Sequence, residues 1–137
     1  MSKHPIVSGG IYKKDKQTRK LRTLLTPILE EYRIDFFISG HEHSSQVIQL
    51  KLSSHKITAL IAGASVVSYP GSVSGLANML WANDADCGVV LKLQYDAGSF
   101  SYQFVNNSTV LYHGMKSKLA VVEEEWPTET MEIDSDT

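Results

Sequence analysis

The sequence lacks the features that mark several large classes of protein. It holds a single cysteine, Cys87, which excludes an intramolecular disulfide. It has neither the run of about 18 apolar residues that a transmembrane helix needs nor the pattern of a signal peptide. It also has no basic stripe with interleaved aromatic residues, so no nucleic-acid partner is expected.

Charge is distributed unevenly along the chain. The 137 residues, 42% of them hydrophobic, are enough for one globular domain. Residues 123–137 carry seven acidic side chains and no basic ones, and they contain few apolar residues that could pack. We therefore predict a folded part over residues 1–118 and a disordered acidic tail over residues 119–137.

The clearest periodic pattern is helical. Apolar side chains recur at intervals of three and four along one stretch, at Leu21, Leu24, Leu25, Ile28, Leu29 and Tyr32. This spacing predicts an amphipathic helix. Pro27 lies inside it and removes one amide donor, so we expect either a kink or a second helix beginning there.

Histidines flank this helix. His4 begins the segment HPIVSGG (4–10), where proline favours an extended backbone for the residue before it and two glycines permit a sharp turn. After the apolar run 34–38, the segment GHEH (40–43) places His41 and His43 two residues apart. Because side chains two apart in an extended chain share a face, both imidazoles can enter one pocket, which is typical of a metal site.

The order of extended segment, helix and buried strand predicts a parallel βαβ unit. Such a unit brings the ends of its two strands to the same edge of a sheet, where ligands of α/β proteins usually bind. We therefore expect His4 to lie close to His41 and His43 despite the intervening helix.

The second half of the sequence alternates between apolar and polar residues, as strands do. We expect strands over residues 47–52, 57–62, 88–95, 100–104 and 109–112, with a hairpin turn at 96–99. These strands should be antiparallel. The predicted fold is mixed α/β (α+β), with one βαβ unit followed by antiparallel strands.

Together, these motifs resemble a known family. The segment HPIVSGG, the leucine-rich helix with an internal proline, the apolar strand and the segment GHEHSSQ (40–46) resemble the C-terminal half of calcineurin-like metallophosphoesterases. They are most similar to purple acid phosphatases of the small tartrate-resistant type. The resemblance runs from His4 to Lys116 and implies half of a β-sandwich flanked by helices.

The resemblance implies a dinuclear metal centre that hydrolyses phosphate monoesters, with iron paired with iron, zinc or manganese. It makes His4 and His41 ligands of the divalent ion and His43 a ligand of the trivalent iron. Neutral imidazole suits these metals, and two metal ions can stabilise both the attacking and the leaving oxygen. The resemblance also implies a secreted, lysosomal or vacuolar parent protein, although the sequence itself leaves the compartment open.

The sequence departs from the family in the acidic half of the site. The family takes its other ligands from Gly-Asp and Gly-Asn motifs, and this sequence contains neither dipeptide. Glu42 stands where the family usually has aspartate or asparagine. Three histidines lack the anionic charge that a trivalent ion requires, so we expect at best half a metal site. We expect the chain to be a fragment, a truncated gene product or one piece of a split protein.

Lys13 stands where the small mammalian-type enzymes have a further histidine that faces the substrate. It either contacts phosphate or belongs to a solvated basic helix entry, and the second interpretation is the stronger one. Residues 76–81 form either a short lid or, more simply, a packed loop. We interpret four other polar residues as structural: Asp84, Asp86, His55 and His113.

Three functions remain open at this level. The leading prediction is part of a metal-dependent acid phosphatase, inactive by itself because its aspartate, asparagine and tyrosine ligands are absent. The alternative is a non-catalytic remnant of the fold that serves as a binding or scaffold piece. A mononuclear three-histidine zinc site is the third. Because half a sandwich exposes apolar surface, we also expect self-association.

Overall fold

The computed structural model describes residues 1–117, and the predicted acidic tail lies outside them. The described part has one helix and seven strands in two sheets. The elements are α1 (Lys16–Glu31), β1 (Phe36–Ser39), β2 (Ser45–Lys51), β3 (Lys56–Ala62), β4 (Met79–Asn83), β5 (Val89–Asp96), β6 (Ser99–Asn106) and β7 (Thr109–Ser117). This confirms the predicted mixed α/β class.

Helix α1 begins at an aspartate cap. The side chain of Asp15 accepts a hydrogen bond from the Thr18 amide at 3.0 Å, which satisfies one of the free donors at the helix start. The helix runs through Pro27 to Glu31 as one element, so a second helix beginning at the proline is wrong. Its apolar side packs Leu29 onto the core, and this packing holds the helix together across the proline.

The first sheet contains the predicted βαβ unit with a very short first strand. Its strand order is β1-β3-β2-β4, with β1 parallel to β3 and the other pairs antiparallel. On the other side of β1, Ser2 forms a single parallel bridge with Ser39. The N-terminal segment, α1 and β1 therefore make a parallel crossover, although the first strand is only one bridge long.

The second sheet is the meander β5-β6-β7. The hairpin predicted around residues 96–99 is present, and Ala97 and Gly98 both have positive φ at its turn. Tyr102 of β6 lies directly over Gly114 of β7, where a Cβ would come within 2.6 Å of the tyrosine ring. Burial raises the pKa of Tyr102 to about 12.

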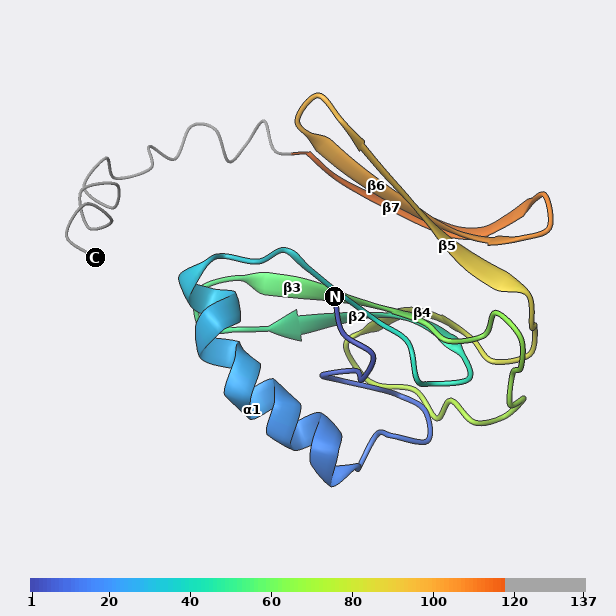
Figure 1. The fold of residues 1–137 in the computed structure, drawn as a ribbon, viewed down its shortest axis with the longest axis horizontal. Helices are drawn as coiled ribbons and strands as arrows, with labels where there is room; N and C mark the ends of the chain where they lie inside the picture. The colour runs from blue at the N-terminus through green and yellow to red at the C-terminus, as the bar shows by residue number, and fades with distance from the viewer. Residues whose placement is uncertain (118–137) are drawn as a thin grey trace.

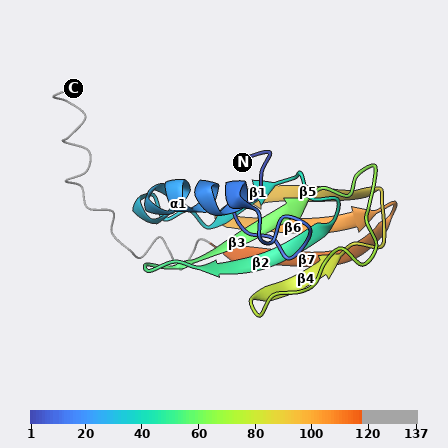
Figure 2. The same ribbon diagram turned by 90° about the horizontal axis from the view of Figure 1, so that it is seen from below.

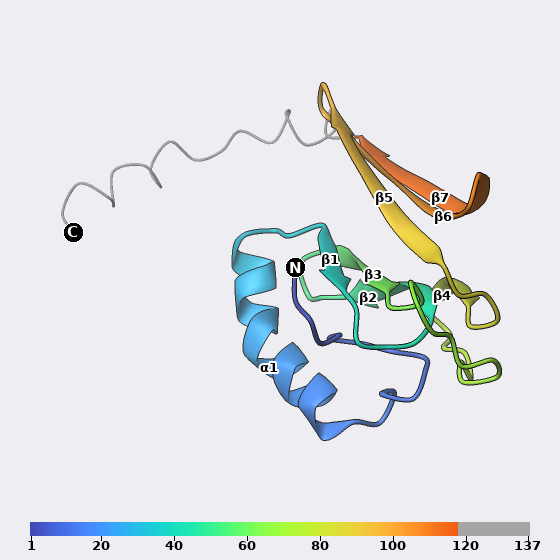
Figure 3. The same cartoon turned by 45° about the vertical axis from the view of Figure 1, so that its right-hand side comes forward.

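The molecule has three layers (Figure 1). Helix α1 covers one face of the first sheet and the second sheet covers the other, an arrangement that Figure 2 and Figure 3 show from two further directions. One hydrophobic cluster fills the space under α1 and includes Ile6, Leu29 and Ile48. A second cluster joins the two sheets and includes Phe104 and Leu60. The loops that carry the histidines leave this framework at one end.

Two local predictions are wrong. Residues 79–81 are neither a lid nor a packed loop, because they belong to β4, where Trp81 packs its ring 5.0 Å from Phe104. This aromatic contact across the sheets favours the strand. The last strand does not end at residue 112 as predicted: β7 continues to Ser117, and His113 lies inside it opposite Gln103.

The other three polar residues have hydrogen-bond partners within the protein. Asp84 accepts from the Val73 amide and Asp86 from Asn83 in the loop after β4. The His55 ring bonds the Ile34 carbonyl at 2.7 Å. In the part of the chain that the structure describes, no helix is long and apolar enough to cross a membrane.

Candidate functional site

Two loops meet at the end of β1. One follows Ser2 and carries His4, and the other follows β1 and carries His41 and His43. The Gly40 amide donates to the Lys3 carbonyl at 3.2 Å, which continues the parallel pairing that Ser2 begins. As a result, the ring centroids of His4 and His41 lie 4.7 Å apart. The proximity of these two histidines is as expected, and their role as metal ligands stays a prediction.

A tyrosine completes a cluster of three rings. Tyr12 stacks on His41 with a centroid distance of 4.3 Å and meets His4 edge-on at 5.6 Å. Tyr12 has no periodic signal in the sequence, because it lies in an irregular loop between Gly10 and α1. Tyr12 joins the site only because this loop folds over His41.

His4 is held from the side of α1. Its Nε2 lies 3.0 Å from the Thr18 hydroxyl and 3.2 Å from the Asp15 carboxylate. Asp15 therefore caps the helix and orients the imidazole at the same time. The aspartate before the helical pattern is a sequence signal for the cap, but nothing in the sequence connects it to His4.

The Asp15 contacts predict a pH dependence. The Thr18 amide lowers the pKa of Asp15 below its ordinary value of 3.8, and His4 adds to this shift. A carboxylate with a lowered pKa stabilises the folded state above its unfolded pKa, and this stabilisation is lost as the pH falls through the folded pKa. Unfolding in urea between pH 6 and pH 2 should show this acid loss, and D15N should be less stable at pH 6 and less sensitive to acid. Equal slopes for both proteins in this range would contradict the assignment.

His41 has an unusual backbone. Its φ is +70°, a left-handed conformation that side chains rarely adopt and that is common at functional sites. Burial lowers the pKa of His41 below 6.5, and the neighbouring His4 lowers it further. Both effects favour the neutral imidazole, which is the form that binds metals.

His43 points into different surroundings. Its ring lies 4.6 Å from the ring of Tyr69, and its backbone carbonyl accepts a hydrogen bond from the Tyr69 amide. Within residues 1–117 its Nδ1 is buried and has no hydrogen-bond partner. A buried polar atom without a partner costs free energy, so this nitrogen is the most suitable one in the two loops for a metal or another missing partner.

Glu42 joins the two loops from inside. Its side chain is 1% exposed, and its Oε1 accepts from the Ser8 hydroxyl and, at 2.9 Å, from the Tyr12 amide. Gln46 acts in the same way nearby, because its Oε1 accepts from the Gly9 amide at 2.8 Å. The Glu42 contacts fix the loop that carries His4 against the loop that carries His41, and the Gln46 contact fixes the first of these loops against β2.

Lys13 points toward another loop. Its Nζ donates to the Gly75 carbonyl at 3.0 Å and lies 3.3 Å from the Ser74 hydroxyl. These contacts account for its position without a phosphate. A direct contact with substrate stays a prediction.

The described residues do not fit a complete dinuclear centre. Within residues 1–117, no group of three His, Cys, Asp or Glu side chains is arranged to hold a metal ion. The two carboxylates of these loops, Asp15 and Glu42, are already bound to the protein's own donors. A trivalent ion needs anionic oxygen ligands, and the three imidazoles do not supply them.

Comparison with known proteins identifies the fold of this chain. No family model matches the chain, and no curated protein matches it. Among solved structures, the chain is similar to "GAP50 the anchor in the inner membrane complex of Plasmodium", with a TM-score of 0.66 and 21% sequence identity. The match covers 85% of this chain and 35% of the other, so the chain spans about a third of that protein. At this identity the likeness shows a shared fold.

Proposed function

We propose that the chain is a non-catalytic binding or scaffold piece built on the fold of a calcineurin-like metallophosphoesterase. The use of its carboxylates carries this proposal. Asp15 caps α1 and orients His4, and Glu42 bonds Ser8 and Tyr12. A trivalent ion requires anionic ligands, and these two carboxylates are already used to hold the loops together.

The similarity to GAP50 also supports a scaffold role. GAP50, described as an anchor, shares the fold of this chain, which agrees with a non-catalytic use of the fold. A scaffold role needs a stable arrangement of loops, and the buried Glu42 and Gln46 contacts provide one. It does not need a metal ion.

Metal content and hydrolysis test this proposal together. The purified chain, incubated with iron and zinc salts and desalted, should retain clearly less than two ions per chain and should hydrolyse an aryl phosphate weakly or not at all. The H41A and H43A variants should leave any residual rate unchanged. Two tightly held ions with turnover that H41A removes would contradict the scaffold role.

An acid phosphatase whose other ligands come from elsewhere is the second candidate. The unpartnered Nδ1 of His43 and the strained backbone of His41 favour it, because both are expected where a metal once bound or still binds. The resemblance implies iron paired with iron, zinc or manganese, and a phosphate monoester as substrate. Both candidates predict little hydrolysis by this chain alone, so metal retention separates them: one tightly held ion that H43A removes would favour the phosphatase, because half a metal site still binds through its histidines.

A further inference from the structure

Positive charge is concentrated where α1 begins. Residues 13–22 hold six basic side chains and one acidic one, Asp15. Four of the basic side chains are exposed, and we call them the basic start of α1: Lys14, Lys16, Arg19 and Lys20. Within residues 1–117, none of these four forms an ion pair. The first turn of the helix also has no acidic residue, so the positive end of the helix dipole adds to their charge.

The acidic side chains of the helix do not neutralise this cluster. Asp15 accepts from the Thr18 amide and lies 3.2 Å from Nε2 of His4. Glu30 and Glu31 lie at the opposite end of α1. Like charges four residues apart on a helix repel each other, as those of Lys16 and Lys20 do. The basic start of α1 therefore favours an anionic partner.

The chain itself contains a segment of matching negative charge. Residues 123–137 carry seven acidic side chains and no basic ones. They follow β7, where Lys116 forms an ion pair with Asp35, a residue just beyond the end of α1. The 20 residues after Ser117 can extend over roughly 60 Å, whereas a helix of 16 residues is about 24 Å long. The acidic segment is therefore long enough to reach the basic start of α1.

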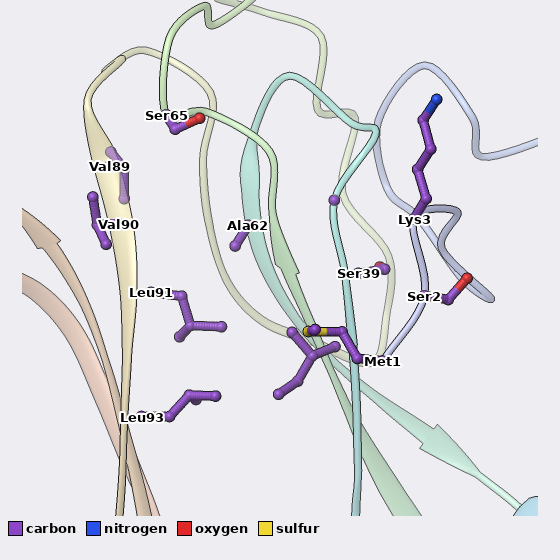
Figure 4. A pocket seen from close by; sticks show the side chains of 12 residues that line it. Met1, Ser2, Lys3, Ser39, Ala62, Ser65, Val89, Val90, Leu91 and Leu93 are labelled. Carbon is purple, nitrogen blue, oxygen red and sulfur yellow. The ribbon is translucent and has the colours of Figure 1, made fainter.

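The cavities of the described residues suit an acidic segment less well. The larger one, of about 570 Å³ between β1 and β5, is lined mainly by apolar and small side chains such as Leu91, and Lys3 is its charged side chain (Figure 4). The smaller one, of about 130 Å³, contains Lys116, whose charge is already paired with Asp35. The unpaired charge at the basic start of α1 is the better match.

We propose that the acidic segment 123–137 binds the basic start of α1 within the same chain. An exposed ion pair contributes little alone, but several pairs on one tether act together because the effective concentration is high. Asp15, which orients His4, lies in the same stretch. The bound segment therefore lies beside the histidine loops and screens them from other anions. This inference goes beyond the proposed binding or scaffold role and does not depend on it.

Zero-length cross-linking of the full chain tests the proposal. A carbodiimide joins a carboxylate to a lysine amine only where the two groups are in contact, and peptide mass spectrometry identifies the linked residues. At low salt the monomeric product should contain links from residues 123–136 mainly to Lys14, Lys16 and Lys20. In about 1 M salt, which screens charges beyond about 3 Å, the yield of these links should fall roughly fivefold.

Two pairs of neighbouring lysines provide matched variants. K16E/K20E reverses two charges at the basic start of α1 and should lower the yield of links to the unaltered Lys14 roughly fivefold. K51E/K56E reverses two exposed lysines that face each other on β2 and β3, and it should leave the links to Lys14 unchanged.

Three outcomes overturn the proposal. The first is an absence of links at low salt, or links spread evenly over the exposed lysines. The second is an equal yield at Lys14 in the two double variants. The third is links that occur only in a cross-linked dimer, because the partner is then a second copy. Two tightly held metal ions with hydrolysis, beside an intact pattern of links, would instead contradict the proposed scaffold role alone.

Discussion

Replacement of Glu42 by alanine is expected to lower the free energy of unfolding by about 3 kcal/mol. The Glu42 side chain is 1% exposed and accepts from the Ser8 hydroxyl and the Tyr12 amide. Its removal leaves the buried Ser8 hydroxyl and the part-buried Tyr12 amide without this acceptor and opens a cavity between the loops. Equilibrium unfolding in urea measures the change in free energy. The rings of His4 and His41 should also separate, and the NMR contacts between them should then be lost.

Glu30 offers a matched control. Its carboxylate also accepts from a serine hydroxyl and a backbone amide, both of Ser53, but these contacts are exposed to solvent. Water replaces the lost acceptor there, so E30A should destabilise the chain much less than E42A. E42Q keeps an acceptor oxygen and should fall between E42A and the unaltered chain. An equal loss for E30A and E42A would show that burial of Glu42 is not what makes it important.

Replacement of Gly63 by alanine is expected to prevent folding at 37 °C. A Cβ at this position would lie 1.4 Å from the backbone carbonyl oxygen of Glu42 and 2.6 Å from its carbonyl carbon. Because backbone atoms cannot rotate away as a side chain does, the loop that carries His41 and His43 would have to move. The Gly63 amide also donates to the Ser44 carbonyl at 3.1 Å. We expect a loss of more than about 4 kcal/mol, with the variant accumulating in the insoluble fraction.

Gly40 is the control for this substitution. It begins the same loop, and a Cβ there would meet its nearest atom, the carbonyl oxygen of Ala62, at an ordinary distance of 3.5 Å. G40A should therefore cost less than about 1 kcal/mol and remain soluble. Soluble yield and urea unfolding compare the two variants. A soluble G63A variant with an unchanged unfolding midpoint would contradict the close approach of the two backbones.

Periodic segments of the fold were predictable from the sequence, and irregular ones were not. The helix around Leu25, the hairpin after Tyr95 and the strand before Ser39 follow from local spacing and turn chemistry, which the structure confirms. Residues 79–81 were misinterpreted because the contact of Trp81 with Phe104 joins segments far apart in the sequence. Such contacts leave no periodic trace.

The histidine site also has a part that the sequence predicted and a part that it did not. The crossover order predicted that His4 would approach His41, and the rings are 4.7 Å apart. The roles of Glu42, Asp15 and Tyr12 were not predictable, because each depends on a hydrogen bond or stacking contact between loops that only folding brings together. Their residue types alone are common in solvated loops.

The sequence by itself determined the class of fold, the crossover and the pair of histidine loops, because alternation and helical spacing are local properties of a chain that must bury its apolar side chains. The tertiary structure decided which partner each polar side chain has: it assigned Asp15 to His4, Glu42 to Ser8 and left Nδ1 of His43 without a partner among the described residues. It also placed the apolar strand β1 at an edge. These outcomes depend on the three-dimensional meeting of distant segments, since burial and hydrogen bonding are satisfied between loops and not along them.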